Sequence, residues 1–187
     1  MTFPAADRAR LVEIIKARSV ETGREFRLAS GRTSDFYCNL KPTMMDPEGA
    51  YLIGALVSDT IRPGEADLVG GLEMGAVPIA TAVAAIGYAR GRPLPAFCVR
   101  KAAKEHGTRS VIEGLNRGAT LAGKRVIIVE DVTTTGGSSA KAIEAVRADG
   151  GQVVRVITIV DRQEGADETF RRLDVPFTAL VVAAELR

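Results

Sequence analysis

The fold of this 187-residue chain is decided by Val126-Ile127-Ile128-Val129-Glu130-Asp131-Val132-Thr133-Thr134-Thr135-Gly136-Gly137-Ser138-Ser139. Four aliphatic residues lead into two adjacent acids, and a run rich in threonine, glycine and serine follows. Ile143 and Val146 then continue at a spacing typical of a helix. In this order the residues predict a buried parallel strand, a tight polar loop and the N-terminus of a helix.

The polar loop has the chemistry of a phosphate site. The first N–H groups of a helix have no partner within the helix, and the helix dipole favours an anion there. Glu130 and Asp131 would repel phosphate, so they suit a neighbouring polyol or a metal ion. An ordinary strand-to-helix turn could carry the same glycines and hydroxyl groups. The acid pair in front of them favours a site for a sugar phosphate, with the ribose hydroxyls on the acids.

The pattern is neither the glycine pattern of dinucleotide sites nor the lysine-containing loop of nucleotide sites. Over its whole length it resembles the motif that binds 5-phosphoribosyl-1-pyrophosphate (PRPP) in type I phosphoribosyltransferases. The resemblance implies the fold of that family, which is an α/β fold with a central, mainly parallel sheet flanked by helices.

The composition limits the other possibilities. Hydrophobic residues make up 46% and charged residues 26% of the chain, and the net charge is +2. These values predict a soluble protein with one domain over residues 1–187 and no nucleic-acid partner. No apolar run approaches the roughly 20 residues of a membrane span, so no membrane partner is expected. Cys38 and Cys98 lack metal-ligand spacing; we expect core thiols in a reduced, cytoplasmic setting.

The rest of the chain alternates between strand and helix patterns. Helices are predicted at 5–18, after Asp46 and at 78–88, and strands at 67–71, 94–100, 153–160 and 177–182. This alternation predicts a mainly parallel sheet with helices on both faces. Residues 1–45 would form an N-terminal helix and a small hood, with a hairpin around Ser30-Gly31. Polar loops should meet at one sheet edge; these are residues 71–76, 130–138, 161–165 and the loop after Arg100.

Residues 101–121 show no apolar periodicity and predict a long loop. The charged residues around it are Arg100, Lys101, Lys104, Arg109 and Arg117, against Glu105 and Glu113. A solvated, mobile surface loop would fit this pattern. Beside a phosphate site, however, it suits a cationic lid, because displacement of pyrophosphate from a ribose builds negative charge on the leaving group. His106, the only histidine, could be idle or could contact that group.

Three further features resemble the orotate phosphoribosyltransferase family. They are Phe26-Arg27-Leu28-Ala29-Ser30-Gly31-Arg32 with Ser34-Asp35-Phe36-Tyr37, then Arg100-Lys101-Ala102-Ala103-Lys104-Glu105-His106-Gly107, and Asp161-Arg162-Gln163-Glu164. With the PRPP motif they cover residues 25–165 in the order of the family. The resemblance implies transfer of ribose 5-phosphate from PRPP to orotate, which gives orotidine 5'-phosphate and pyrophosphate in de novo UMP biosynthesis.

The resemblance also implies roles for single residues. Lys101, Glu130 and Asp131 would be catalytic. PRPP would be bound by Arg100, Lys101, Lys104, His106, Glu130, Asp131, Val132, Thr133, Thr134, Thr135, Gly136, Gly137 and Ser138, and orotate by Thr134 and Arg162. An arginine beside the carboxylate of orotate also satisfies charge complementarity. Mg²⁺ would be carried by PRPP, without dedicated protein ligands. In this family the lid reaches across a homodimer with shared active sites, so Lys101 would act on the neighbouring subunit.

Some positions depart from the family or stay open. Ala29 and the segment Glu73-Met74-Gly75-Ala76 stand where some members carry lysines, and Arg27 or Arg32 could compensate. Phe36 and Tyr37 could line the base pocket or simply pack the hood. A phosphoribosyltransferase for a purine is a rival, but a cationic Arg162 has no evident partner on a neutral purine. A PRPP-binding regulator of RNA or DNA is another, and it would need a broad basic face.

Overall fold

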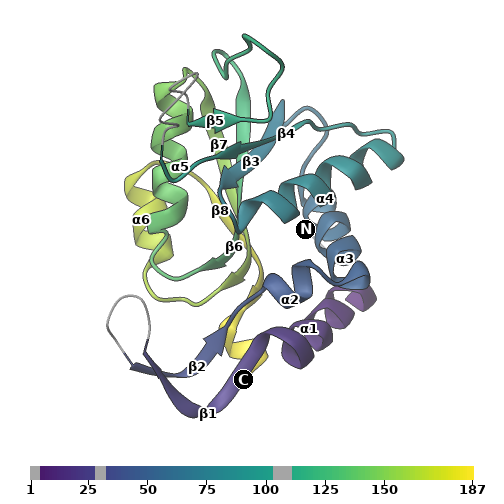
Figure 1. Ribbon diagram of the computed structural model, residues 1–187, viewed down its shortest axis with the longest axis vertical. Helices are drawn as coiled ribbons and strands as arrows, with labels where there is room; N and C mark the ends of the chain where they lie inside the picture. Colours follow the sequence, from purple (N-terminus) through teal and green to yellow (C-terminus); the bar gives the residue numbers. More distant parts are fainter. Residues whose placement is uncertain (1–4, 28–32, 103–110) are drawn as a thin grey trace.

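The computed structural model describes residues 5–27, 33–102 and 111–187. Figure 1 shows a twisted sheet with helices on both sides and a two-stranded hairpin at one end. The helices are α1 (Ala5–Ser19), α2 (Lys41–Met44), α3 (Pro47–Thr60), α4 (Ala76–Ala89), α5 (Gly137–Ala148), α6 (Ala166–Arg172) and the 3-10 helix η1 (Ala183–Leu186). The strands are β1 (Val20–Arg27), β2 (Thr33–Cys38), β3 (Leu68–Leu72), β4 (Ala96–Val99), β5 (Ile112–Glu113), β6 (Arg125–Thr133), β7 (Gln152–Asp161) and β8 (Phe177–Val182).

The central sheet has the strand order β5-β4-β3-β6-β7-β8. From β4 to β8 all neighbouring strands pair in parallel, and only the short edge strand β5 is antiparallel. The predicted α/β class and the mainly parallel sheet flanked by helices are confirmed. Because the strands are parallel, the loops that follow β3, β4, β6 and β7 leave the sheet at one edge.

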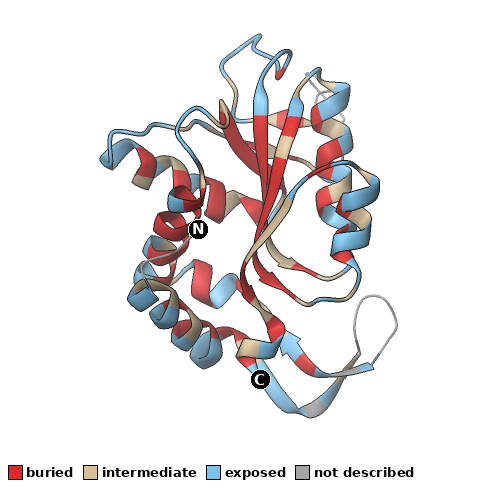
Figure 2. Cartoon of the chain, turned by 180° about the vertical axis from the view of Figure 1, so that it is seen from behind, coloured by how far each residue is buried: buried red, intermediate tan, exposed pale blue. Residues whose placement is uncertain are grey.

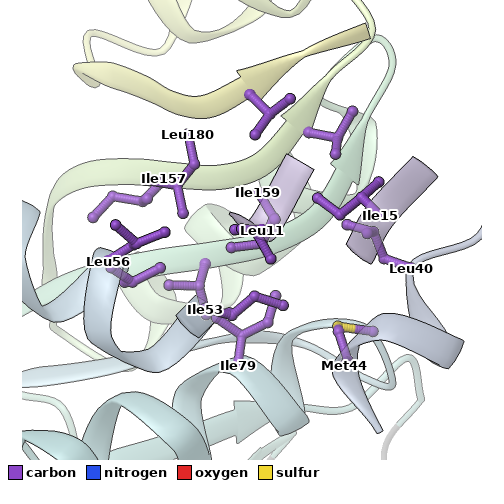
Figure 3. Packing of buried hydrophobic residues seen from close by; sticks show 14 of the residues in the cluster. Leu11, Ile15, Leu40, Met44, Ile53, Leu56, Ile79, Ile157, Ile159 and Leu180 are labelled. Carbon is purple, nitrogen blue, oxygen red and sulfur yellow. The ribbon is translucent and has the colours of Figure 1, made fainter. Parts of the chain in front are cut away.

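Strand β6 lies inside the sheet and is buried on both faces. Ile127 and Val129 pack into the cluster under α1, α3 and α4, whereas Val126 and Ile128 pack on the opposite face with Ile143 of α5. The alternation follows from the two-residue repeat of a strand. Figure 2 shows the buried sheet between mostly exposed outer helix faces, and Figure 3 shows the first cluster around Ile53, Leu56 and Ile79.

The N-terminal part is tied to the end of the sheet. On α1, the Nε atom of Arg8 donates to the carbonyl of Leu180 on β8 at 2.9 Å, and the Nη2 atom pairs with Glu185 at 2.7 Å. The strands β1 and β2 form the predicted antiparallel hairpin, with Val20 opposite Cys38. Ser30 and Gly31, between these strands, lie outside the described residues. The hairpin therefore stands beside the carboxyl ends of β6, β7 and β8 (Figure 1).

Several short elements were not predicted. The helices α2, α6 and η1 have four, seven and four residues, too few for a helical repeat to stand out. The two residues of β5 lie inside the segment predicted as a structureless loop. By contrast, the predicted helix start after Asp46 is confirmed, since the Oδ1 atom of Asp46 accepts a hydrogen bond from the N–H of Gly49 at 3.0 Å. Within the described part of the chain, no helix is long and apolar enough to cross a membrane.

Candidate functional site

The polar loop between β6 and α5 encloses a cavity of about 220 Å³. Its lining consists of Glu130, Val132, Thr133, Thr134, Thr135, Gly136, Gly137 and Ser138. Helix α5 begins directly at this loop, so the N–H groups of its first turn, which have no partner within the helix, are available there. Gly136 precedes the helix with φ +82°, a conformation that side chains rarely adopt. The loop thus has the geometry of an anion site.

Thr133 adds an unsatisfied donor to this loop. Its side chain is buried, and its Oγ1 atom has no hydrogen-bond partner among the described residues. Buried polar atoms in folded proteins are almost always paired, and an unpaired one calls for an explanation such as a ligand. The carbonyl of Thr133 accepts a 2.9 Å hydrogen bond from the N–H of Arg162, which joins the loop to the end of β7.

Glu130 is a buried carboxylate, with 8% of its surface exposed. Burial raises its pKa to about 7, and the neighbouring charge of Asp131 also raises it. A hydrogen bond from the Oγ atom of Ser139 and the positive charge of Lys101 act in the opposite direction. The carboxyl group can therefore gain or lose a proton near neutral pH.

Asp131 is half-buried and faces the N-terminus of α4. Its Oδ1 atom accepts a hydrogen bond from the N–H of Val132 at 2.9 Å. A Cβ atom placed on Gly75 would lie 2.5 Å from the same oxygen, so a side chain at this position would displace the carboxylate. The carboxylate of Asp131 is thus held against the start of α4, next to the polar loop.

Arg162 connects the end of β7 to both the polar loop and the hairpin. Only 7% of its side chain is exposed, and its Nε atom donates to Glu164 at 2.8 Å. Its guanidinium carbon lies 5.6 Å from the centre of the Phe36 ring. Tyr37 instead stacks on Phe26 at 5.3 Å between ring centres. Since successive side chains of a strand alternate between faces, Phe36 faces Arg162 and Tyr37 faces away.

Cys38 is a neighbour of this site that the sequence did not reveal. It follows Phe36 by two residues on β2, so its side chain points to the same face. Burial and the negative charge of Asp131 raise its pKa to about 12, while the positive charge of Arg162 acts in the opposite direction. The thiol is therefore near enough to Asp131 and to Arg162 to sense both charges. Without knowing where β2 packs, a lone cysteine carries no signal of this position.

The cationic segment after β4 starts at the edge of the sheet where the polar loop also lies. The N–H of Lys101 donates to the carboxylate of Glu73 at 2.9 Å, and Arg100 pairs with Glu113 at 3.3 Å. The strands β4 and β5 pair in register Cys98 to Glu113, which holds together the two ends of the loop. Lys104 and His106, also assigned to PRPP, lie outside the described residues.

A second cavity, of about 710 Å³, adjoins the polar loop. Its lining consists of Leu72, Val99, Arg100, Lys101, Val111, Ser138, Lys141, Glu144, Ala145 and Ala148. Ser138 belongs to both cavities, so the cations that begin the loop and the start of α5 border a common space. The fold thus brings the acid pair, the polar loop, Arg100, Lys101 and Arg162 to one edge of the sheet.

Comparison with known proteins gives consistent matches. Residues 46–182 match the model of the phosphoribosyl transferase domain. The orotate phosphoribosyltransferase of Bradyrhizobium diazoefficiens is 58% identical over 181 residues, which cover 97% of this chain and 96% of that protein. The crystal structure of the orotate phosphoribosyltransferase of Mycobacterium tuberculosis H37Rv with Fe(III) dicitrate is 40% identical with a TM-score of 0.83, covering 96% of this chain and 98% of that one. The structure of that enzyme with PRPP has 37% identity, a TM-score of 0.79 and the same coverage.

Proposed function

This chain belongs to the phosphoribosyl transferase domain family, and we propose that it acts as an orotate phosphoribosyltransferase. It transfers ribose 5-phosphate from PRPP to orotate, which yields orotidine 5'-phosphate and pyrophosphate in pyrimidine biosynthesis. One observation carries the proposal: the N–H of Arg162 bonds to Thr133 of the polar loop, so a cation suited to a carboxylate stands beside a site suited to a sugar phosphate.

In the proposed complex, PRPP lies across the end of β6. Its 5-phosphate would occupy the cavity of residues 132–138, where the first N–H groups of α5 would donate to it. The carboxylates of Glu130 and Asp131 accept hydrogen bonds from the two ribose hydroxyls. Negative charge at these positions also stabilises the cationic character that the sugar develops as the pyrophosphate leaves.

Orotate would bind between the polar loop and Arg162. The guanidinium group pairs with the orotate carboxylate, since charge-assisted hydrogen bonds of this kind are strong and directional. Thr134, which lines the loop cavity, would contact the base. Phe36 of the hairpin packs against Arg162. Residues 1–45 would thus form an N-terminal helix and a hood within a single domain of residues 1–187.

The leaving pyrophosphate would face Arg100, Lys101, Lys104 and His106. Preorganised cations stabilise the charge that grows on it, and closure over the site keeps water from the reactive sugar. The reaction needs positioning and electrostatics, without a covalent protein intermediate. Mg²⁺ would enter on the oxygens of PRPP and neutralise the charge of the diphosphate.

A homodimer with shared active sites is also part of the proposal. Large apolar side chains stand exposed on the helical layer and at the end of β3, namely Met45, Tyr51, Met74 and Tyr88. Tyrosine and methionine are enriched at protein interfaces relative to the rest of the surface. Lys101 is exposed at the start of the cationic segment and would act on the site of the neighbouring subunit.

Because both substrates are charged and do not cross membranes freely, we expect the enzyme to work in the cytoplasm.

The proposed function is tested by turnover of a panel of bases. The protein is incubated with PRPP, Mg²⁺ and each base in turn, and orotate is followed by its absorbance. We expect consumption of orotate that depends on PRPP. Turnover of a purine without turnover of orotate would assign a different base. Binding of PRPP without turnover of any base would indicate a regulator instead of an enzyme.

The acid limb of the pH profile should reflect Glu130. Its pKa is raised to about 7, so the carboxylate is ionised above that pH and protonated below it. Because the ionised form accepts the ribose hydroxyls, kcat/KM for PRPP should fall as the pH drops through about 7. The profile is compared with that of Glu130→Gln, in which this limb should vanish. The phosphate groups of PRPP titrate in the same way with both enzymes. Identical pH profiles for the wild type and Glu130→Gln would therefore contradict the assignment of the acid limb to Glu130.

Gly75→Ala should lower kcat/KM on the order of 10²-fold, the cost of a catalytic group displaced by about 1 Å. The new Cβ atom would lie 2.5 Å from Oδ1 of Asp131, so the carboxylate has to move. The backbone of Gly75 has φ −59°, which alanine adopts freely, so the melting temperature should change little. A variant with full activity would show that the position of Asp131 does not matter for the reaction.

A further inference from the structure

Ser139 links helix α5 to the strand that carries the acid pair. Its side chain is completely buried in the first turn of α5, with 0% exposed. Its Oγ atom donates a hydrogen bond of 2.6 Å to Oε2 of Glu130, which is itself buried. None of the roles proposed above uses this hydroxyl group.

The other groups around Glu130 do not replace this donor. Asp131, next to it on β6, and Lys101, at the end of β4, act on its carboxylate through their charges, in opposite directions. On β7 the residue in register with Glu130 is Thr158, whose hydroxyl donates to the backbone carbonyls of Glu130 at 3.4 Å and Val160 at 3.2 Å. Within the described residues, Ser139 on α5 donates directly to the side chain.

We propose that Ser139 is a positioning residue that favours the ionised form of Glu130 and aims this carboxylate at a ribose hydroxyl of PRPP. Its hydrogen bond fixes Oε2 and leaves Oε1 for the substrate. A hydroxyl donor so close favours the charged carboxylate over the neutral acid, because the bond to the charged form is the stronger one. The inference rests on the proposed function, since it takes PRPP as the ligand of Glu130.

Removal of the hydroxyl in Ser139→Ala should move the titration of Glu130 upward. We expect the pH at which PRPP affinity is half lost to rise by about one unit, which is the order expected for one hydrogen bond to a charged group. The ratio of the wild-type and variant affinities should then approach about tenfold at acid pH and return to about one at alkaline pH. A purely structural defect would weaken binding equally at every pH.

The affinities are measured by titration calorimetry with PRPP and Mg²⁺ over this pH range. Ser58→Ala is the matched control, because it removes a buried helical serine hydroxyl from α3, outside the proposed site. Its curve should follow the wild type. In a Glu130→Gln background, Ser139→Ala should cause no pH-dependent change, since no carboxylate remains to titrate. Melting temperatures show that each variant is folded.

The possible outcomes distinguish a failure of the proposed role of Ser139 from a failure of the proposed enzyme function. If Ser139→Ala binds PRPP with a curve parallel to the wild type, or still shifts the curve when Glu130 is glutamine, the positioning role is overturned. If the wild type binds no PRPP and consumes no orotate, the proposed function fails instead. A shift of the midpoint that disappears in the Glu130→Gln background supports the role of Ser139.

Discussion

Replacement of Lys101 by alanine is expected to lower the turnover number on the order of 10²- to 10³-fold, as for other groups that stabilise charge only in the transition state. The side chain is exposed, while its backbone N–H is anchored to Glu73 at 2.9 Å. The backbone anchor survives the substitution, so the cation alone is lost. Since an exposed side chain contributes little to folding, the melting temperature should stay within about one degree or two of the wild type.

Lys124→Ala is the matched control for this prediction. Lys124 is an exposed lysine that precedes β6, at the end of the strand opposite to the acid pair. The Lys124→Ala variant loses the same positive charge, but at a place away from the proposed site, so kcat should not change. Steady-state rates with saturating orotate and PRPP measure both variants. Full turnover by the Lys101 variant would eliminate the cationic segment as a source of catalysis.

Mixed dimers test whether Lys101 serves the neighbouring subunit. Lys101→Ala and Asp131→Ala subunits are each expected to be nearly inactive alone. If the site is shared, a mixed dimer contains one site with both wild-type groups, and part of the activity should return. If each subunit uses its own Lys101, mixing should restore nothing.

The sequence predicted those parts of the molecule whose signal is local. The aliphatic run from Val126 to Val129 identified a strand buried on both faces, and both faces are indeed covered by helices. The acid pair and the polar loop are adjacent in the chain, so their proximity in space follows from their spacing. The start of the helix after Asp46 was likewise predictable from the sequence, because its capping hydrogen bond joins residues that are three apart in the chain.

Contacts between distant segments could not be predicted in this way. Cys38 lies near Asp131 only because β2 folds back toward the end of the sheet, which no periodicity encodes. The bond from Lys101 to Glu73 joins segments 28 residues apart. Phe36 and Tyr37 looked equivalent in the sequence, and only the packing of β2 separates the face near Arg162 from the face near Phe26.

Arg162→Ala should raise KM for orotate by at least about 30-fold, which corresponds to the roughly 2 kcal/mol or more expected when a partly buried charge loses its partner. Its guanidinium is 7% exposed and packed against Phe36, so it is preorganised for one planar carboxylate. The dissociation constant of PRPP should stay near the wild-type value, because the acid pair and the polar loop are intact. Arg172→Ala, which removes an exposed arginine from α6, should change neither constant.

Loss of Arg162 also leaves Glu164 without the Nε donor it has at 2.8 Å, so a structural defect has to be separated from a defect in recognition. Uracil as the alternative substrate distinguishes the two defects, because it has the ring of orotate without the carboxylate. If Arg162 reads the carboxylate, the preference of the wild type for orotate over uracil should shrink in the variant, while the weak rate with uracil stays the same. If Arg162 only supports the hood, both rates should fall together and the preference should survive. Specificity is a difference between two affinities, so only their ratio assigns the role of this arginine.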